Sequence, residues 1–197
     1  MTTPAPIPVP QAHPRRIAAI LGAAACIAAG ILLLVAAGLP DRARETAQFV
    51  LPDARVVAAE IGAVAPPFRL MDPDGANIAL DSFKGQAVIV NFWATWCAPC
   101  RVEMPELQKI AERYAGQVTV LGINTGEDAG AVRAWRDEFA LTFPLLLDVE
   151  GTAARDYRLR GQPTTVIVAP DGVISAIVYG PADSATLEQA IVALLEN

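Results

Sequence analysis

Two cysteines three positions apart, Cys97 and Cys100, have the clearest capacity for chemistry in this chain. The run before them, AVIVNFW at 87–93, is apolar and rich in β-branched and aromatic residues, which predicts a buried strand. Cys97 should therefore lie near the first turn of the next helix, where free amide donors and the helix dipole favour a thiolate. Cysteine reacts as the thiolate, so Cys97 is the predicted nucleophile. Cys100 shares its helical face and is the predicted resolving thiol, able to close a disulfide.

The residues around the pair favour disulfide exchange over metal binding. Pro99 suits the first turn of a helix, where its missing N–H had no partner to lose. No histidine lies between the cysteines to stabilise the thiolate further, so we expect a reducing pair closer to thioredoxin than to the strong oxidants. A structural zinc site needs four ligands. Cys26 and His13, the only other cysteine and the only histidine, lie far upstream, so one chain cannot supply such a site.

The elements that must position the cysteines alternate between strand and helix. After the pair, Met104, Leu107, Ile110 and Tyr114 recur at helical spacing, which predicts an amphipathic helix of about four turns. Pro105 lies inside that helix and should kink it, because it removes a backbone donor.

The remaining pattern predicts an α/β fold with a central mixed sheet and helices on both faces. Asp74-Gly75 is a strong hairpin signal between two short apolar pieces. The Pro170-Asp171-Gly172 turn joins the last two expected strands, TTVIVAP and GVISAIVYG. The other expected elements are hairpin strands at 68–71 and 78–80, strands at 118–124 and 144–148, and helices at 128–138, 152–157 and 185–195.

The N-terminal part of the chain has a different composition from the rest. Residues 1–16 are rich in proline and predict a disordered tail. Residues 17–39 carry no charge, and the run is long enough for one transmembrane helix, although small residues near its end leave a cleaved signal peptide as an alternative. Residues 40–60 read as a linker with some helical character, and 61–197 as the folded domain. Arginines flank the apolar run on both sides, so charge alone hardly orients it.

The folded part is acidic. Residues 1–40 hold two of the 15 basic residues and none of the 21 acidic ones, which leaves 13 basic against 21 acidic and a net charge of −8. Duplex binding relies on clustered lysine and arginine, so we expect no nucleic-acid partner. Because His13 lies in the tail, mechanisms with a histidine base or ligand inside the domain are excluded.

At this point the motifs resemble a known family. WCAPC after AVIVNFWAT, and GQPTT before VIVAPDG, are similar to the membrane-anchored thioredoxin-like thiol-disulfide oxidoreductases of the TlpA/ResA type, related to the cytochrome c biogenesis reductants. The resemblance implies a thioredoxin fold with an N-terminal β-hairpin extension and an inserted αβ element. It also implies a single-pass protein of the cell membrane, with its tail in the cytoplasm and its domain on the periplasmic side.

The same resemblance implies further site residues. Pro163 matches the cis-proline of the family, whose loop, with Gln162, faces the cysteines and exposes backbone for a substrate strand. Trp96 is expected at the rim of the site, beside Pro99, whereas Trp93 at the end of a buried strand is expected in the core.

Glu103 matches an acidic residue that some family members use to tune the thiols or shuttle protons. A solvated glutamate on the helix surface is the alternative. Asn91 departs from cytoplasmic thioredoxins, which carry a buried aspartate there, and it cannot accept the proton itself. That difference draws attention to Glu103.

The implied partners are protein disulfides, such as those of apocytochrome c or of copper-site assembly factors, and an integral-membrane electron donor of the cytochrome c biogenesis type. We expect no cofactor and no metal ion. Two alternatives stay open: a peroxiredoxin-like thiol peroxidase, which shares the APPFRL opening but whose Pro-x-x-x-Thr-x-x-Cys context is missing here, and a copper(I) metallochaperone that uses the two thiolates.

Overall fold

The computed structural model describes residues 49–50 and 55–195. The chain divides into two compact units, Met1–Ala47 and Gln48–Asn197, of which only the second contains described residues. The predicted tail at 1–16 and the predicted transmembrane helix at 17–39 lie outside the described residues. Within the described ranges, no helix has the length and apolar character needed to cross a membrane.

A seven-stranded mixed sheet forms the centre of the domain, with the strand order β4-β3-β7-β6-β5-β8-β9. The parallel strands β5, β6 and β7 lie side by side, β8 and β9 continue the sheet antiparallel beyond β5, and the β3–β4 hairpin pairs antiparallel with β7. Every residue of β5 is buried, as expected for the strand that leads to the cysteines. The strands are β3 (Arg69–Met71), β4 (Asn77–Ala79), β5 (Ala87–Trp93), β6 (Val118–Thr125), β7 (Leu145–Asp148), β8 (Thr164–Val168) and β9 (Ile174–Tyr179).

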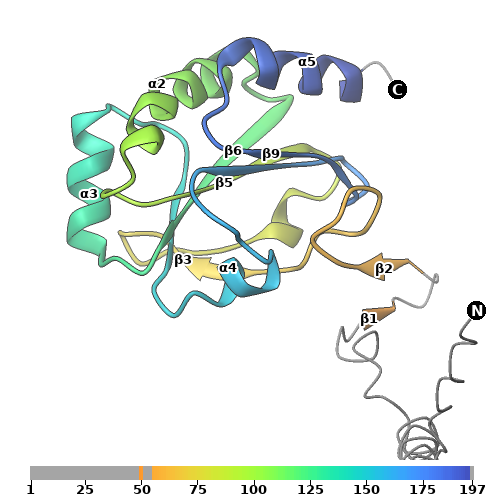
Figure 1. Cartoon of the computed structure of the whole chain (residues 1–197), viewed down its shortest axis with the longest axis horizontal. Coiled ribbons are helices and arrows are strands. Elements are labelled where there is room, and N and C mark those ends of the chain that lie inside the picture. Colours follow the sequence, from red (N-terminus) through yellow and green to blue (C-terminus); the bar gives the residue numbers. More distant parts are fainter. Residues whose placement is uncertain (1–48, 51–54, 196–197) are drawn as a thin grey trace, which may run out of the picture. The chain divides into compact units, whose positions relative to one another are not determined.

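Helices cover both faces of this sheet, which confirms the predicted fold class. One core gathers Ile89 and Trp93 of β5 with side chains of α2, α3 and α5, and the alternate residues Val88, Val90 and Phe92 pack into a second core on the other face. Figure 1 shows α2 and α5 together on one side of the sheet and α4 on the other. The helices are α2 (Ala98–Arg113), α3 (Ala129–Glu138), α4 (Thr152–Asp156) and α5 (Ser184–Leu195), with a short 3-10 helix η1 (Leu80–Phe83) after the hairpin.

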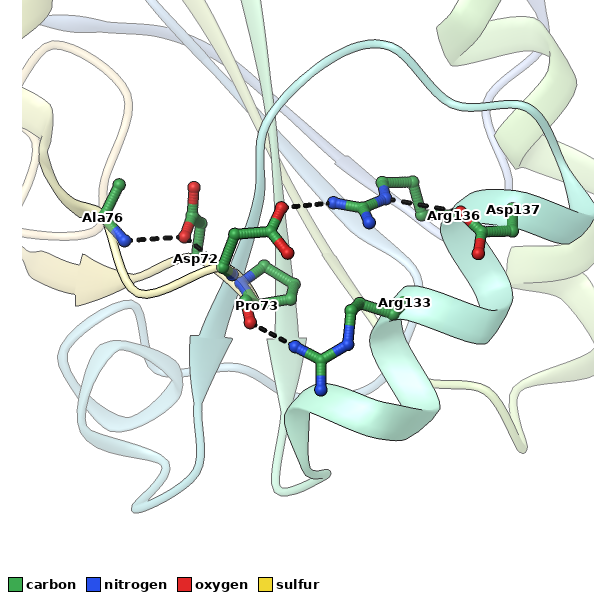
Figure 2. A network of polar contacts seen from close by, with 7 residues as sticks. Asp72, Pro73, Ala76, Arg133, Arg136 and Asp137 are labelled. Atoms are coloured by element: carbon green, nitrogen blue, oxygen red, sulfur yellow. Dashed lines mark hydrogen bonds and ion pairs between the residues drawn. The ribbon is translucent and has the colours of Figure 1, made fainter.

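The predicted hairpin contacts helix α3. In the hairpin turn the Asp72 carboxylate accepts a hydrogen bond from the backbone N–H of Asp74 at 2.9 Å. Arg136 of α3 pairs with the Asp74 carboxylate at 2.6 Å, and Arg133 donates to the carbonyl of Pro73 (Figure 2). The hairpin is therefore fixed to α3 at its turn, as well as to β7 through strand pairing.

The folded unit begins earlier than predicted. The stretch 40–60 was expected to be a linker with helical character, but β1 (Phe49–Val50) pairs antiparallel with β2 (Val56–Val57). Val64 then bridges both Val57 and Val173, so this segment is bound to the turn between β8 and β9. The two β-branched residues of β2 favour a strand, but a run of two is too short to show strand periodicity.

The other element predictions hold to within about one or two residues, the usual uncertainty of helix and strand ends. Asp128 is the N-cap residue of α3, and its carboxylate accepts the backbone N–H of Ala131 at 2.9 Å. Pro105 lies inside α2, and the kink it should cause stays a prediction.

Candidate active site

Cys97 and Cys100 lie at the start of α2, just after the central strand β5 ends. Cys97 is the N-cap residue of α2, and a disulfide joins it to Cys100, with the two Cα atoms 5.3 Å apart. The backbone N–H of Cys100 donates to the Cys97 sulfur at 3.2 Å. Both cysteines are buried. When the disulfide is reduced, this amide and the helix dipole favour the Cys97 thiolate.

Exposed apolar residues lie close in sequence to the buried cysteines. Trp96, expected at the rim of the site, is 72% exposed, and Val102 one turn into α2 is 71% exposed. Pro99, between the cysteines, is also exposed. Large exposed apolar side chains beside a reactive group suit contact with another protein. The substrate-binding roles of Trp96 and Pro99 stay predictions.

The loop before β8 carries the second predicted part of the site. The peptide bond between Gln162 and Pro163 is cis, as the resemblance implies. β8 pairs with β5 so that Thr164, its first residue, lies opposite Phe92. The loop before β8 therefore lies at the C-terminal end of β5, where the cysteines follow. The Gln162 side chain is engaged within the domain, since its Nε2 donates to the carbonyl of Trp93 at 3.3 Å and to the Thr125 hydroxyl. Its amide thus fixes the loop, and substrate contact by Gln162 and Pro163 stays a prediction.

Glu103 is buried in the domain, so the alternative of a solvated surface glutamate is wrong. Only 1% of the residue is exposed, because it shares the inner face of α2 with Cys100 and Leu107. Its Oε1 accepts hydrogen bonds from the Thr165 hydroxyl and the Ala182 N–H, both at 3.1 Å. Burial raises the pKa of Glu103, and the hydrogen bonds to the carboxylate offset only part of that shift.

Asn91 of β5 completes the surroundings of this carboxylate. Its Nδ2 donates to Glu103 Oε2 at 3.0 Å and to Thr165 Oγ1 at 2.9 Å. Its Oδ1 is buried and has no hydrogen-bond partner among the described residues. The residue that departs from cytoplasmic thioredoxins is thus in direct contact with Glu103.

A second carboxylate near the cysteines was missed from the sequence. Glu127, just after β6, accepts hydrogen bonds from the Thr95 N–H and the Asn124 Nδ2, both at 2.7 Å, and from the Thr95 hydroxyl. Thr95 lies two residues before Cys97, so Glu127 fixes the turn that presents the nucleophile. A signal was present, because the carboxyl ends of parallel strands β5 and β6 meet at one sheet edge, where functional side chains gather.

Aromatic side chains pack in the core next to the site. Trp93 is fully buried, which confirms its predicted place in the core, and its ring stacks on that of Trp135 with centroids 5.2 Å apart. The guanidinium of Arg101, next to Cys100, lies 4.8 Å from the Trp135 ring centroid. Gly122 leaves room for this packing, because a Cβ there would lie 2.8 Å from Leu145 Cδ2 and 3.1 Å from Trp93 Nε1.

Outside the cysteine pair, a metal ion or a small ligand would need a cluster of ligating side chains or a cavity. Within 49–50 and 55–195, no cluster of three or more His, Cys, Asp or Glu side chains is arranged to hold a metal ion. A cavity of 460 Å³ lies at the opposite end of β5, lined by residues such as Phe83, Val88 and Val168. It does not involve the cysteines.

Comparison with known proteins shows the family of this chain. A family model described as the AhpC/TSA family matches residues 61–177. The chain is 39% identical over 138 residues to the thioredoxin-like protein YneN of Bacillus subtilis, over 68% of this chain and 81% of YneN. It is 33% identical over 133 residues to the thiol-disulfide oxidoreductase ResA of Geobacillus kaustophilus, over 67% of this chain and 76% of ResA.

A solved structure gives the same answer at the level of the fold. A Chlorobium tepidum protein described as a candidate thiol:disulfide interchange protein DsbE superposes with a TM-score of 0.65 at 30% identity, over 69% of this chain and 98% of that protein. The chain therefore belongs to the AhpC/TSA family, and within it is a thioredoxin-like thiol-disulfide oxidoreductase of the ResA and DsbE type.

Proposed function

We propose that this chain reduces disulfide bonds in partner proteins on the outer side of the cytoplasmic membrane. The observation that carries the direction of electron flow is the modest stabilisation available to the Cys97 thiolate. One amide N–H, that of Cys100, contacts the sulfur. The adjacent cation, Arg101, is paired with Glu138 at 2.6 Å and stacked on Trp135. Strong oxidants owe their potential to a highly stabilised reduced form, so a weakly stabilised thiolate favours a reductant.

The cycle transfers two electrons and two protons to the substrate. The Cys97 thiolate attacks one sulfur of the substrate disulfide, forms a mixed disulfide and expels the other sulfur, which takes up a proton. Cys100 then loses its proton and attacks the Cys97 sulfur. The second substrate sulfur leaves as a thiolate and takes up a proton, so the substrate is fully reduced, and the Cys97–Cys100 disulfide described above is the oxidised product.

Glu103 is the proposed base for the second step. It follows Cys100 by one helical turn, and both side chains lie on the buried face of α2. A thiol has an ordinary pKa of about 8.5, well above that of a glutamate in water. Because burial raises the pKa of Glu103, the carboxylate is a better acceptor for the Cys100 proton than an exposed glutamate would be.

The proposed setting is a membrane anchor formed by residues 17–39, with an integral-membrane donor that returns the electrons. Anchoring raises the effective concentration of the domain near a membrane donor. The acceptor class we propose is protein disulfides exposed outside the membrane, with apocytochrome c and copper-site assembly factors as the first candidates. The name of the ResA relative, thiol-disulfide oxidoreductase, supports the chemistry of this proposal.

The reduction potential of the Cys97–Cys100 pair tests the direction. The full-length chain in detergent is equilibrated with dithiothreitol or glutathione buffers, and the redox state is read from tryptophan fluorescence. A value near the thioredoxin potential of about −270 mV is expected for a reductant. A value near about −120 mV, as for strong periplasmic oxidants, would reverse the proposed direction of electron flow.

The two alternative chemistries have separate readouts. A thiol peroxidase consumes hydrogen peroxide at a rate that depends on Cys97. A copper(I) chaperone binds one copper ion tightly and reduces disulfides negligibly. We expect reduction of a protein disulfide such as insulin, with neither of those two results.

A further inference from the structure

The amide of Asn91 contains a buried hydrogen-bonding atom that the cycle above does not use. Its Nδ2 has two partners, Glu103 Oε2 at 3.0 Å and Thr165 Oγ1 at 2.9 Å. Its Oδ1 has none among the described residues, although Asn91 is fully buried. A buried polar atom without a partner is costly, so its retention at the centre of the core requires a reason.

The hydrogen bonds around Glu103 are those of an ionised carboxylate. Three groups approach its oxygens: the Asn91 amide, the Thr165 hydroxyl and the Ala182 N–H. All three donate, and an ionised carboxylate is purely an acceptor. A neutral carboxylic acid carries an O–H that must itself find an acceptor, and none of these three donating atoms can serve unless the Thr165 hydroxyl turns.

The missing acceptor is present on the same amide. A half-turn about the last side-chain torsion of Asn91 exchanges the positions of Nδ2 and Oδ1, and such amide torsions are broad and roughly two-fold. After the half-turn, Oδ1 faces Glu103 Oε2 and can accept the proton of the neutral acid. Oδ1 lacks a partner when Glu103 is ionised, and Nδ2 lacks one after the turn, when Glu103 is neutral. The unpartnered amide atom therefore does not favour one protonation state of Glu103 over the other.

We propose that Asn91 is a positioning residue that follows the protonation state of Glu103. Its Nδ2 donates to the carboxylate, and its Oδ1 accepts from the neutral acid after the amide turns. A base that relays the Cys100 proton needs a hydrogen-bond partner both as the carboxylate and as the neutral acid. Asn91 can be that partner in both states without ionising itself. The link to the thiols rests on the proposed function, whereas the amide turn does not.

Other ionisable groups on the neighbouring segments have partners of their own. On α2, Glu106 pairs with Lys109 at 2.8 Å, while Cys97 and Cys100 are held in the disulfide. Before α5, the exposed Asp183 accepts the Thr186 N–H at 2.8 Å. The residues facing Glu103 from β5 and β8, Asn91 and Thr165, do not ionise.

The test follows the Asn91 amide directly by NMR. The oxidised full-length chain in detergent micelles is labelled with 15N-asparagine and 13C-glutamate and titrated with acid. We expect the Asn91 side-chain amide resonances to shift with the same midpoint as the Glu103 carboxyl carbon, because its hydrogens leave the carboxylate as the proton arrives. In Glu103→Gln the Asn91 resonances should not change with pH. Amide resonances that stay fixed while Glu103 titrates would overturn the proposal.

A variant comparison tests the same point independently. In Asn91→Leu both protonation states lose one hydrogen bond, so the proton affinity of Glu103 should change by less than about threefold. Thr165→Val is the matched control: it removes a donor that serves the carboxylate, so the affinity should rise by about tenfold. If Asn91→Leu raises the affinity as much as Thr165→Val does, Asn91 only donates and the turn does not occur. Neither experiment involves a substrate, so failure of the reductase proposal would not affect the result.

Discussion

Removal of the Glu127 carboxylate should loosen the turn that presents Cys97. Glu127 receives hydrogen bonds from the Thr95 N–H and from Asn124 Nδ2, both at 2.7 Å, and from the Thr95 hydroxyl. No other side chain bonds to the backbone of Thr95 in the described part of the chain. We therefore expect Glu127→Ala to lower both the free energy of unfolding and the rate at which Cys97 attacks a disulfide.

The size of the stability loss follows from these contacts. A hydrogen bond to a charged group contributes about 1.5–3 kcal/mol net. Glu127 and Thr95 are only half-buried, so water can replace part of what Glu127→Ala removes. The full sum for three bonds is therefore too large, and a loss of about 2–3 kcal/mol is expected. Glu127→Gln keeps one acceptor oxygen but turns an NH2 group toward a donor, so about half of that loss should remain.

Urea unfolding of the oxidised chain, followed by tryptophan fluorescence, measures the change. Glu112→Ala is the matched control, because the exposed Glu112 carboxylate accepts a single hydrogen bond from Gln108 at 2.7 Å. Its removal should cost less than about 0.5 kcal/mol. The rate of attack on 5,5′-dithiobis(2-nitrobenzoate) by the reduced chain reports the effect on Cys97. Equal stability of Glu127→Ala and Glu112→Ala would refute the proposed role of Glu127.

Three further results are expected. Gly122→Ala should lower the unfolding free energy by about 1–2 kcal/mol in urea, because its Cβ would lie 2.8 Å from Leu145 Cδ2, whereas Gly161→Ala, with open space at that position, should be neutral. Glu103→Gln should become more stable relative to the wild type as pH rises. Because the pKa of Glu103 is raised in the folded state, its contribution to the free energy of unfolding is complete below the unfolded pKa of 4.5 and is lost as pH rises through the folded pKa. A difference in melting temperature that is equal at pH 4 and pH 7 would contradict the assignment. Cys100→Ala should accumulate a mixed disulfide between Cys97 and a protein substrate on non-reducing gels, since the resolving thiol is gone; an absent adduct would mean that Cys97 is not the attacking thiol.

The parts of the fold that sequence reasoning predicted are those with a strong local signal. β5 has seven residues, six of them apolar or aromatic and one an asparagine, and all seven are buried. α2 and α3 have helical periodicity, and Asp128 marks the start of α3 by its capping side chain. β1 and β2 escaped prediction because strands of two residues have no periodicity, and their pairing depends on contacts distant in the sequence.

The site was predicted where the chemistry depends on neighbours along the chain, and missed where it depends on neighbours across the sheet. The spacing of Cys97 and Cys100 is enough to predict a disulfide at a helix start. The burial of Glu103 is not readable from its type, because glutamate normally faces solvent. Thr165 of β8 and the Ala182 N–H are distant from Glu103 in the sequence and reach its carboxylate only in the folded chain.

The two carboxylates near the cysteines illustrate how burial and hydrogen-bonding partners assign different tasks to the same side chain. Glu127 is half-buried and binds a backbone N–H of the turn before Cys97, so its side chain is fixed in place by contacts that water can also reach. Glu103 has 1% exposure, and burial raises its pKa toward the range in which a thiol can give it a proton. Loss of Glu127 should therefore lower Cys97 reactivity by loosening the turn before it, whereas loss of Glu103 should change the pH dependence of the Cys100 step. The pH profiles of the two variants separate a residue that positions the nucleophile from one that exchanges protons with the resolving thiol.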